Sequence, residues 1–273
     1  MTSSLPFAEV IGDPIEHSRS PDIHGFWLDT LGIAAYYRRQ RVGDGELPDY
    51  VARVRADPAW RGSNVTMPLK RAALDLAEEA SDRAIAASAA NLLFNQDGRL
   101  FAANTDVGAI ATLIDAARTA GRAVDSVTLF GCGGAARGAL VALKLLDVDE
   151  VRIQARDMTA ATRLAVEFGL TLAPRPFLAP VESEVLINAT PLGMAGQSCL
   201  NCDLAMMPGN GLVFDMVSNP YDTPLVLAAR ARKLAVITGL DMLIEQAATS
   251  FSLMFGQDPP RDRDAELRRR LAA

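Results

Sequence analysis

The stretch VTLFGCGGAARGAL, residues 127–140, decides the fold class of this chain. Its first four residues are apolar or β-branched and predict a buried strand. Gly131, Gly133 and Gly134 follow, and the alanine-rich run after them predicts a helix that begins in a tight turn. The backbone amides and the dipole at such a helix start attract an anion, so this order favours a site for a dinucleotide pyrophosphate.

The rest of the chain repeats this alternation of strand and helix, without an internal repeat. Short apolar runs predict strands at 9–11, 36–42, 64–67, 100–103, 151–154, 185–188 and 211–215. Helical spacing predicts helices that begin near Pro21 and Lys70, and helices at 47–54, 107–120, 135–146 and 160–168. Strands that alternate with helices in this way indicate an α/β protein with a parallel, doubly wound sheet.

Length and composition exclude several classes of protein. With 273 residues the chain is long enough for a large core and two domains. No apolar run approaches the roughly 20 residues of a membrane helix, and the N-terminus lacks a basic segment followed by an apolar one, so we expect a cytoplasmic protein without a membrane partner. The net charge of −6 argues against nucleic acid as a partner, and we expect the basic run at 268–270 to end the last helix.

Three cysteines fit a reducing compartment without a disulfide framework. Cys199 and Cys202 form a C-x-x-C pair, but the chain has no second pair, and its two histidines, His17 and His24, lie far upstream. A zinc site therefore lacks its usual ligands, and we expect no bound metal. Cys132 lies in the glycine turn, where packing of a small apolar side chain accounts for it.

Polar residues stand near the ends of several predicted strands and helices. Ser18 and Ser20 precede the helix at Pro21, where they serve either as helix caps or as two hydroxyls for one small carboxylate. Lys70 is either a solvated side chain or the partner of Asp106, which follows another apolar run. A lysine beside an aspartate can donate and accept a proton in a reaction.

Arg156 and Asp157 follow the strand predicted at 151–154, just over 20 residues after the glycines. At that place a dinucleotide-binding fold reads the adenosine ribose. An arginine there favours the 2′-phosphate of NADP, whereas an aspartate favours the free 2′-hydroxyl of NAD. The sequence has both residues side by side and leaves both cofactors open.

Eight segments, in order over nearly the whole chain, resemble the shikimate dehydrogenase family. They are GDPIEHSRSPDIH, NVTMPLK, the segment around Asn91, NTDVG, GCGGAARG, NATPLGM, DMVSNPYDTPL and GLDMLIEQA. The resemblance implies an N-terminal α/β substrate domain, 1–106 and 240–273, and an inserted Rossmann-type nucleotide domain, 107–239. It also implies the reversible reduction of 3-dehydroshikimate to shikimate with NADPH, a step of aromatic amino acid biosynthesis in the shikimate pathway.

The family's motifs imply roles for single residues of this chain. Ser18 and Ser20 would hold the substrate carboxylate, and Lys70 with Asp106 would be the catalytic pair. The ring hydroxyls would be bound by Asn64, Thr66, Asn91 and Gln246. The cofactor would be bound by Gly131, Gly133, Gly134, Ala135, Arg156, Asp157, Thr190, Met216 and Gly239.

The chain departs from the family's usual motifs at several positions. It has Ser218 where a tyrosine is usual, Leu92 where a threonine is usual, and Gly25 where an asparagine is usual. Asp157 stands where a threonine or serine is usual. Each of the first three changes removes bulk or a polar group near the expected site. A divergent paralogue that acts on quinate or a related cyclohexane acid, including one that uses NAD, stays open, although Ser20 favours shikimate.

Two other classes of protein share parts of this pattern. A methylenetetrahydrofolate dehydrogenase has a similar layout, but its pterin would require aromatic stacking, and the set Ser18, Ser20 and Asn91 argues against it. A non-catalytic nucleotide-sensing protein would not need Lys70 and Asp106, and this chain has both. We expect a monomer or a homodimer.

Overall fold

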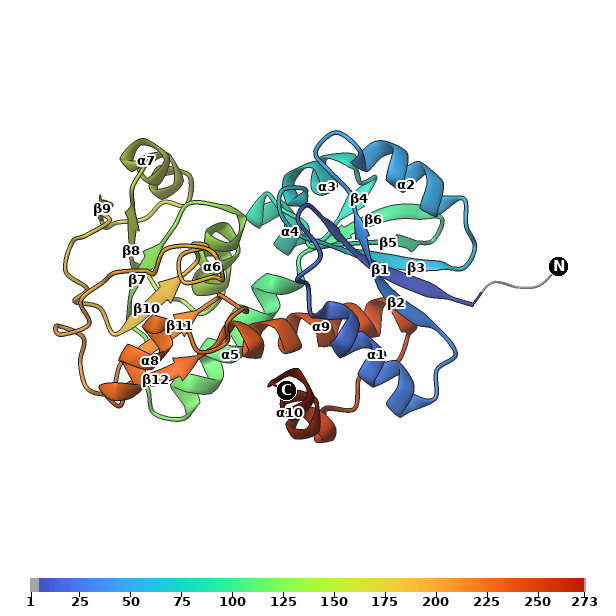
Figure 1. Ribbon diagram of the computed structural model, residues 1–273. Helices are drawn as coiled ribbons and strands as arrows, with labels where there is room; N and C mark the ends of the chain where they lie inside the picture. The colour runs from blue at the N-terminus through green and yellow to red at the C-terminus, as the bar shows by residue number, and fades with distance from the viewer. Residues whose placement is uncertain (1–4, 273) are drawn as a thin grey trace. The chain divides into compact units, whose positions relative to one another are not determined.

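The structure, a computed structural model, describes residues 5–272 (Figure 1). Within these residues the chain forms two compact units. The first unit contains the chain up to Thr105 and again from Ile244, and the second contains Asp106–Leu243. The first boundary lies at the start of helix α5 (Thr105–Thr119), and the second lies inside helix α9 (Gly239–Phe255). No helix in this part of the chain is long and apolar enough to cross a bilayer.

The first unit has a mixed sheet with the strand order β2-β1-β3-β5-β6-β4. Strand β1, next to the edge strand β2, pairs in parallel with β2 and β3, whereas β5 pairs antiparallel with β3 and β6. The strands are β1 (Phe7–Gly12), β2 (Tyr36–Arg41), β3 (Trp60–Val65), β4 (Glu79–Ala80), β5 (Leu92–Gln96) and β6 (Arg99–Ala103). The helices are α1 (Ser20–Leu31), α2 (Leu47–Arg55), α3 (Lys70–Leu76), α4 (Asp82–Ala87), most of α9, the short 3-10 helix η1 (Arg261–Arg263) and α10 (Asp264–Ala272).

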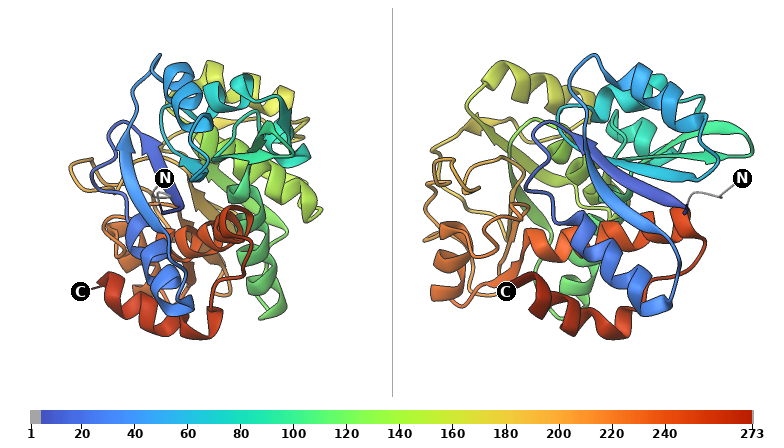
Figure 2. Two further views of the ribbon diagram at one scale, coloured as in Figure 1. Left: turned by 90° about the vertical axis from the view of Figure 1, so that its right-hand side faces the viewer. Right: turned by 45° about the vertical axis from the view of Figure 1, so that its right-hand side comes forward.

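Helices cover both faces of this sheet. Phe7 and Ile11, which point to the same face of β1, belong to a core cluster with Val51 of α2. On the opposite face α1 packs against α9, since the rings of Trp27 and Phe251 meet edge to face with centroids 5.5 Å apart. Figures 1 and 2 show α1 and α9 side by side beneath the sheet, with α2 and α3 above it. Because both faces are buried, all six residues of β1 are buried.

The last helix, α10, packs against α1. The guanidinium carbons of Arg263 and Arg270 lie 5.6 and 4.8 Å from the centroid of the Phe26 ring. Arg270 also donates to Glu266 one turn earlier in α10. The basic run at 268–270 therefore lies near the end of the last helix, as the sequence predicts, and at least its third arginine is engaged in packing.

The second unit has a six-stranded sheet in which the described strands all pair in parallel, with the order β12-β11-β10-β7-β8-β9. This confirms the predicted parallel, doubly wound sheet. Its strands are β7 (Ser126–Phe130), β8 (Glu150–Ala155), β9 (Arg175–Pro176), β10 (Val185–Asn188), β11 (Leu212–Asp215) and β12 (Ala235–Ile237). Its helices are α5, α6 (Gly134–Leu145), α7 (Met158–Glu167), α8 (Pro224–Ala231) and the first residues of α9.

The strand order places a switch point next to the glycine turn. The chain runs outward from β7 through β8 to β9, and then returns to the other side of β7 with β10. Ligands of such sheets bind beyond the carboxyl ends of the strands, where the winding direction changes. The turn after Phe130 and the turn after Asn188 meet at this point, because these two residues are paired in register.

The structure differs from the sequence predictions in the first unit. The strand predicted at 64–67 is instead β3, which ends at Val65, because the chain then turns and the Leu69 amide donates to the Thr66 carbonyl (3.0 Å). The run at 100–103 is part of β6, whose only parallel partner among the described residues is the two-residue strand β4. This run forms an antiparallel hairpin with β5, closed by Asp97 and Gly98, which both have positive φ angles.

Candidate functional site

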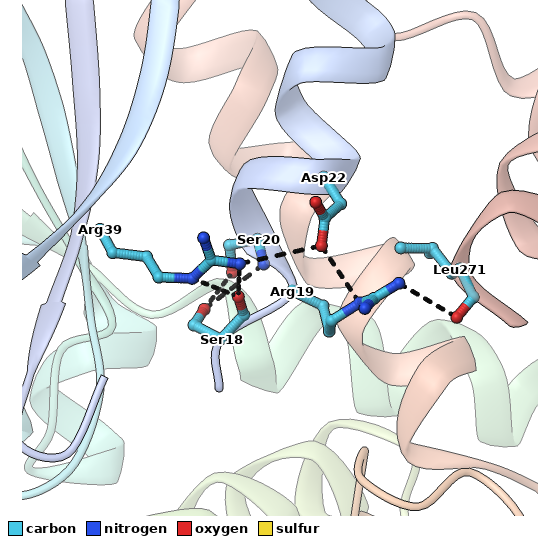
Figure 3. A network of polar contacts seen from close by, with 6 residues as sticks. All are labelled: Ser18, Arg19, Ser20, Asp22, Arg39 and Leu271. Atoms are coloured by element: carbon cyan, nitrogen blue, oxygen red, sulfur yellow. Dashed lines mark hydrogen bonds and ion pairs between the residues drawn. The ribbon is translucent and has the colours of Figure 1, made fainter. Parts of the chain in front are cut away.

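The two serines lie where the loop before α1 enters that helix, and arginines contact this segment (Figure 3). The hydroxyl oxygens of Ser18 and Ser20 are 3.3 Å apart. Arg39 on β2 donates two hydrogen bonds, of 2.8 and 2.6 Å, to the backbone carbonyl of Ser18. Arg19 pairs with Asp22 and donates to the carbonyl of Leu271 in α10. The residue before α1 is Arg19, whose side chain does not cap the helix, while the Ser18 hydroxyl oxygen accepts from the amide of Ser20, the first residue of α1 (3.4 Å).

Asn64, at the end of β3, has its amide held from both sides. The Tyr37 hydroxyl on β2 donates to Asn64 Oδ1 (2.8 Å), and Asn64 Nδ2 donates to Ser250 Oγ (2.8 Å) and to the Asn91 carbonyl (3.3 Å). The Tyr37 ring stacks on the fully buried His24 ring, with centroids 4.1 Å apart. This packing fixes the direction of the Asn64 side chain before any ligand binds.

Asn91 and Gln246 meet at Thr105, although the three residues come from different parts of the chain. Asn91 Oδ1 accepts from the Thr105 amide (2.7 Å), and Asn91 Nδ2 donates to Thr105 Oγ1 (2.9 Å). Gln246 Oε1 lies 3.4 Å from both Asn91 Nδ2 and Thr105 Oγ1. The structure thus brings together Asn64, Asn91 and Gln246, three of the four residues expected to bind ring hydroxyls.

Thr66, the fourth of these residues, lies in the turn after β3. A close approach between this turn and the end of β1 requires Gly12, because a Cβ there would lie 2.5 Å from Thr66 Cγ2 and 2.8 Å from the Met67 carbonyl oxygen. Lys70 is the first residue of α3 and is half-buried. Its carbonyl accepts from the Ala90 amide (2.8 Å), which ties the start of α3 to the residue before Asn91.

In the second unit, the glycine turn is open to a ligand. Gly131 has a φ of +110°, and a Cβ there would lie 2.9 Å from the Ala189 carbonyl oxygen, so glycine is required. A Cβ at Gly133 would meet nothing within 4 Å. Gly134 and Ala135 begin α6, whose first turn has neither an acidic residue nor a side-chain cap. An uncapped, glycine-lined helix start of this kind fits a pyrophosphate.

Arg156 and Asp157 follow β8 and are both exposed, as a ribose-reading pair requires. Asp157 caps α7, because its Oδ1 accepts from the Ala160 amide (2.9 Å). Burial raises the pKa of the Cys132 thiol in the glycine turn, and the charge of Asp157 raises it further. Asp157 therefore stabilises a helix and acts electrostatically on the glycine turn.

Thr190 and Met216 lie in turns that a buried network holds together. Thr190 Oγ1 donates to Asn188 Oδ1 (2.7 Å), and the Met216 amide donates to the Asn188 carbonyl (3.1 Å). Asn188 Nδ2 donates to Asp215 Oδ1 (2.9 Å), and Thr223 donates to the other oxygen of Asp215 (2.5 Å). Burial raises the pKa of Asp215, while these hydrogen bonds oppose the rise.

Gly239 is explained by a close backbone contact. A Cβ there would lie 2.2 Å from the Val217 carbonyl oxygen and 2.7 Å from the Ser218 amide nitrogen. The turn that contains Met216 can therefore lie directly against the start of α9 only if this position is glycine.

The structure places two of the departures from the family's motifs. Gly25 lines a groove of about 330 Å³ between α1 and α10, together with residues such as Asp22 and Leu267. Leu92 is fully buried and is in register with Asn64 on the next strand. Arg19, which lies between the two serines, lines the same groove as Gly25. Leu92 is part of the core beside Asn64.

The C-x-x-C pair carries free thiols. Cys199 is exposed, and burial raises the pKa of Cys202 to about 11. Among the described residues, no group of three or more His, Cys, Asp or Glu side chains is arranged to hold a metal ion.

Sequence reasoning did not select several residues that complete the two sites. Tyr37 and Ser250 hold Asn64, and Asp215 with Thr223 holds the turns of the second unit. Ser250 could have been found from its place four residues after Gln246, which puts both on one face of a helix. Tyr37 carries no such signal, because its partners lie on a different strand and helix.

The fold and these two sets of residues define a class of enzymes. It comprises the dehydrogenases that combine an α/β substrate unit with a Rossmann-type unit for a nicotinamide dinucleotide. The first unit supplies hydroxyls and amides for a small polar molecule, and the second supplies the glycine turn.

Comparisons with known proteins identify the family. The model of the shikimate dehydrogenase substrate binding domain matches residues 10–93, and that of the shikimate 5′-dehydrogenase C-terminal domain matches residues 239–266. Shikimate dehydrogenase (NADP(+)) from Sphingopyxis alaskensis is 46% identical over 272 residues, which cover 98% of this chain and 97% of that protein. The chain belongs to the shikimate dehydrogenase family.

Solved structures agree with this assignment. Shikimate 5-dehydrogenase from Thermus thermophilus, in complex with NADP(H) and shikimate, has a TM-score of 0.86 at 33% identity, covering 98% of this chain and 100% of that one. Quinate dehydrogenase from Corynebacterium glutamicum, in complex with NAD, has a TM-score of 0.84 at 26% identity, covering 97% of this chain and 99% of that one.

Proposed function

We propose that this chain catalyses the reversible NADPH-dependent reduction of 3-dehydroshikimate to shikimate, a step of aromatic amino acid biosynthesis. The observation that carries the proposal is the set of buried amides and hydroxyls of Asn64, Asn91, Thr105 and Gln246 in one unit. Such a set suits the ring hydroxyls of a small polyol acid. Family membership and the relatives named for this reaction support the same conclusion.

Ser18 and Ser20 bind the substrate carboxylate in this proposal. Their hydroxyl oxygens are 3.3 Å apart, close enough to reach one carboxyl group. The bonds from Arg39 to the Ser18 carbonyl hold the loop, so the hydroxyls are presented without a large ordering cost.

The glycine turn of the second unit holds the dinucleotide. Gly131, Gly133 and Gly134 let the pyrophosphate approach the amides that begin α6, and Arg156 pairs with the 2′-phosphate. Thr190, Met216 and Gly239 belong to the turns that line the nicotinamide pocket. When bound, the nicotinamide supplies or accepts the hydride.

Lys70 and Asp106 are the catalytic pair. Hydride addition to a ring carbonyl leaves a negative oxygen that needs a proton, and the Lys70 ammonium donates it. In the reverse direction Lys70 takes the proton from the hydroxyl. Asp106 orients the lysine and accepts a hydrogen bond from the substrate hydroxyl.

Oxidation of quinate or a related cyclohexane acid with NAD is the second candidate. Asp157 favours it, because a carboxylate that acts on the glycine turn opposes a 2′-phosphate there. The likeness to quinate dehydrogenase in complex with NAD points the same way. Purified protein assayed with shikimate and quinate, each with NADP and NAD, separates the two candidates. A kcat/KM highest for quinate with NAD would overturn the main proposal.

Replacement of Lys70 by alanine tests the mechanism. We expect Lys70→Ala to lower kcat by roughly 100- to 10,000-fold and to change KM little, because the ammonium acts mainly in the transition state. Steady-state kinetics with shikimate and NADP measure both constants.

The neighbouring Arg71 provides a matched control. It lies on the same helix and pairs with Asp75 at the surface, so Arg71→Ala should keep near-normal turnover. His17 is the exposed histidine and the rival proton carrier, whereas His24 is fully buried. Normal turnover in Lys70→Ala together with a large loss in His17→Ala would move the proton transfer to His17.

A further inference from the structure

We propose that Ser250 is a positioning residue that makes Asn64 a hydrogen-bond acceptor for a substrate hydroxyl; this rests on the proposed function. Ser250 lies on α9 and is fully buried. Its hydroxyl oxygen is 2.8 Å from Asn64 Nδ2, although 186 residues separate the two in the sequence. It also lies 3.2 Å from Thr105 Oγ1.

The direction of the Ser250 hydroxyl follows from its own helix. Ser250 Oγ donates to the Gln246 carbonyl one turn earlier (3.1 Å), and a hydroxyl has only one proton to give. Its oxygen must therefore accept the other contacts. The acceptor role of Ser250 requires Asn64 to present its NH2 group to α9.

This requirement sets the polarity of Asn64. Both amide protons are used, one toward Ser250 and one toward the Asn91 carbonyl (3.3 Å). Oδ1 then faces β2 and accepts from the Tyr37 hydroxyl (2.8 Å). An amide oxygen has two acceptor positions, so one remains for a ligand. Asn64 can accept from a ring hydroxyl, and it has no proton left to donate to a carbonyl or an ether.

Thr105 is oriented in the same way. Its oxygen accepts from Asn91 Nδ2 (2.9 Å), so its own proton points to Ser250 or to Gln246 Oε1. Ser250 thus accepts a bond from Asn64 and lies within hydrogen-bond distance of Thr105, two side chains from two other segments of the first unit. A buried side chain with this place in the network acts on the substrate through its neighbours.

Removal of the hydroxyl should weaken substrate binding selectively. In Ser250→Ala the buried Asn64 NH2 group loses an acceptor, and the amide can turn over. We expect the KM for shikimate to rise roughly 5- to 100-fold, the range for an unsatisfied buried donor, with kcat within about twofold. The KM for NADP should not change. Ser250→Thr keeps the hydroxyl and should recover a KM nearer to that of the wild type.

Ser252 offers a matched control on the same helix. Its hydroxyl makes the same kind of bond, to the Ala248 carbonyl one turn earlier (3.2 Å), but its other partner is Asp258. Ser252→Ala therefore removes a helix bond without touching the network and should leave all three constants unchanged. A shikimate analogue that lacks the hydroxyl received by Asn64 should bind the wild type and Ser250→Ala about equally.

The experiment measures kcat and both KM values for the wild type and these variants, with the melting temperature of each. A selective rise in the shikimate KM for Ser250→Ala supports the proposal. An unchanged shikimate KM, or an equal rise of both KM values with a lower melting temperature, overturns it. If Ser250→Ala does not fold, Ser250→Cys, with its weaker acceptor, must show the selective rise. Absence of wild-type turnover with shikimate would instead overturn the proposed function, and with it the proposed role of Ser250.

Discussion

Asp157 shows how a single side chain serves both a helix and a ligand site. Its carboxylate caps α7 through the Ala160 amide, and its charge raises the pKa of Cys132 beyond the effect of burial. A negative charge at this place opposes a 2′-phosphate by about 1 to 4 kcal/mol for charges near 4 Å apart. The neighbouring Arg156 acts in the opposite direction.

Asp157→Asn separates these two tasks. Asparagine caps a helix as well as aspartate does, so α7 should stay intact while the charge is lost. We expect the ratio of kcat/KM for NADP to that for NAD to rise about fivefold, the effect of roughly 1 kcal/mol. Initial rates with each cofactor at saturating substrate give the ratio.

Asp203→Asn is the control for this substitution. Asp203 accepts from the Ala205 amide in another exposed turn of the second unit, so its variant should leave the ratio unchanged. If the ratio stays constant in Asp157→Asn as well, the charge of Asp157 does not act on the ribose phosphate.

At the level of helices and strands, the sequence predicted what depends on local pattern. The strand at 185–188 coincides with β10, and the helix at 135–146 differs from α6 by one residue at each end. The hairpin of β5 and β6 was not predicted, although Asp97 and Gly98 between two apolar runs are a strong hairpin signal. The β3 boundary was wrong because an apolar run does not show where pairing to β1 ends.

The residues of the candidate site were likewise predicted only in part. Asn64, Asn91 and Gln246 were named from motifs, and the structure brings them together around Thr105. Apart from Ser250, which lies one helical turn after Gln246, the residues that hold them could not be named, because hydrogen bonds between distant segments leave no periodic trace in a sequence. Tyr37 illustrates this, since its role depends on stacking against His24 from α1.

Two helical glycines should respond oppositely to replacement by alanine. A Cβ at Gly25, inside α1, would meet nothing within 4 Å, so Gly25→Ala should raise the free energy of unfolding by roughly 0.5 to 1 kcal/mol. A Cβ at Gly239 would lie 2.2 Å from the Val217 carbonyl oxygen. Gly239→Ala should therefore lower the free energy of unfolding by roughly 1 to 3 kcal/mol or more. Urea unfolding of both variants measures the two changes in the free energy of unfolding. If both changes had the same sign, the prediction would be wrong.

The stability of the whole chain should depend on pH through His24. Its ring is fully buried between Tyr37 and Phe251, and among the described residues neither ring nitrogen has a hydrogen-bond partner. Burial lowers the pKa of His24 from 6.5 to about 3. As the pH falls below 6.5, His24 is protonated in the unfolded chain but stays neutral in the folded chain. The contribution of His24 is therefore complete above pH 6.5 and is lost progressively toward pH 3.

His24→Phe tests this pH dependence, because phenylalanine keeps an aromatic ring against Tyr37 and cannot titrate. Between pH 6.5 and 4.5 the wild type should lose about 2 kcal/mol more of its free energy of unfolding than His24→Phe does. Urea unfolding at several pH values measures the difference. The exposed His17 is the control, since His17→Asn should follow the wild-type profile. Parallel profiles for His24→Phe and the wild type would show that folding does not lower the pKa of His24.

The outer strand of the first sheet bears on how copies of this chain can meet. β2 lies at one edge of the sheet, and three of its six residues are arginines. Arg38 pairs with Glu9, Arg39 with the Ser18 carbonyl and Arg41 with Asp13, so these side chains are anchored along the edge. Charged side chains along an edge strand disfavour edge-to-edge pairing with another sheet.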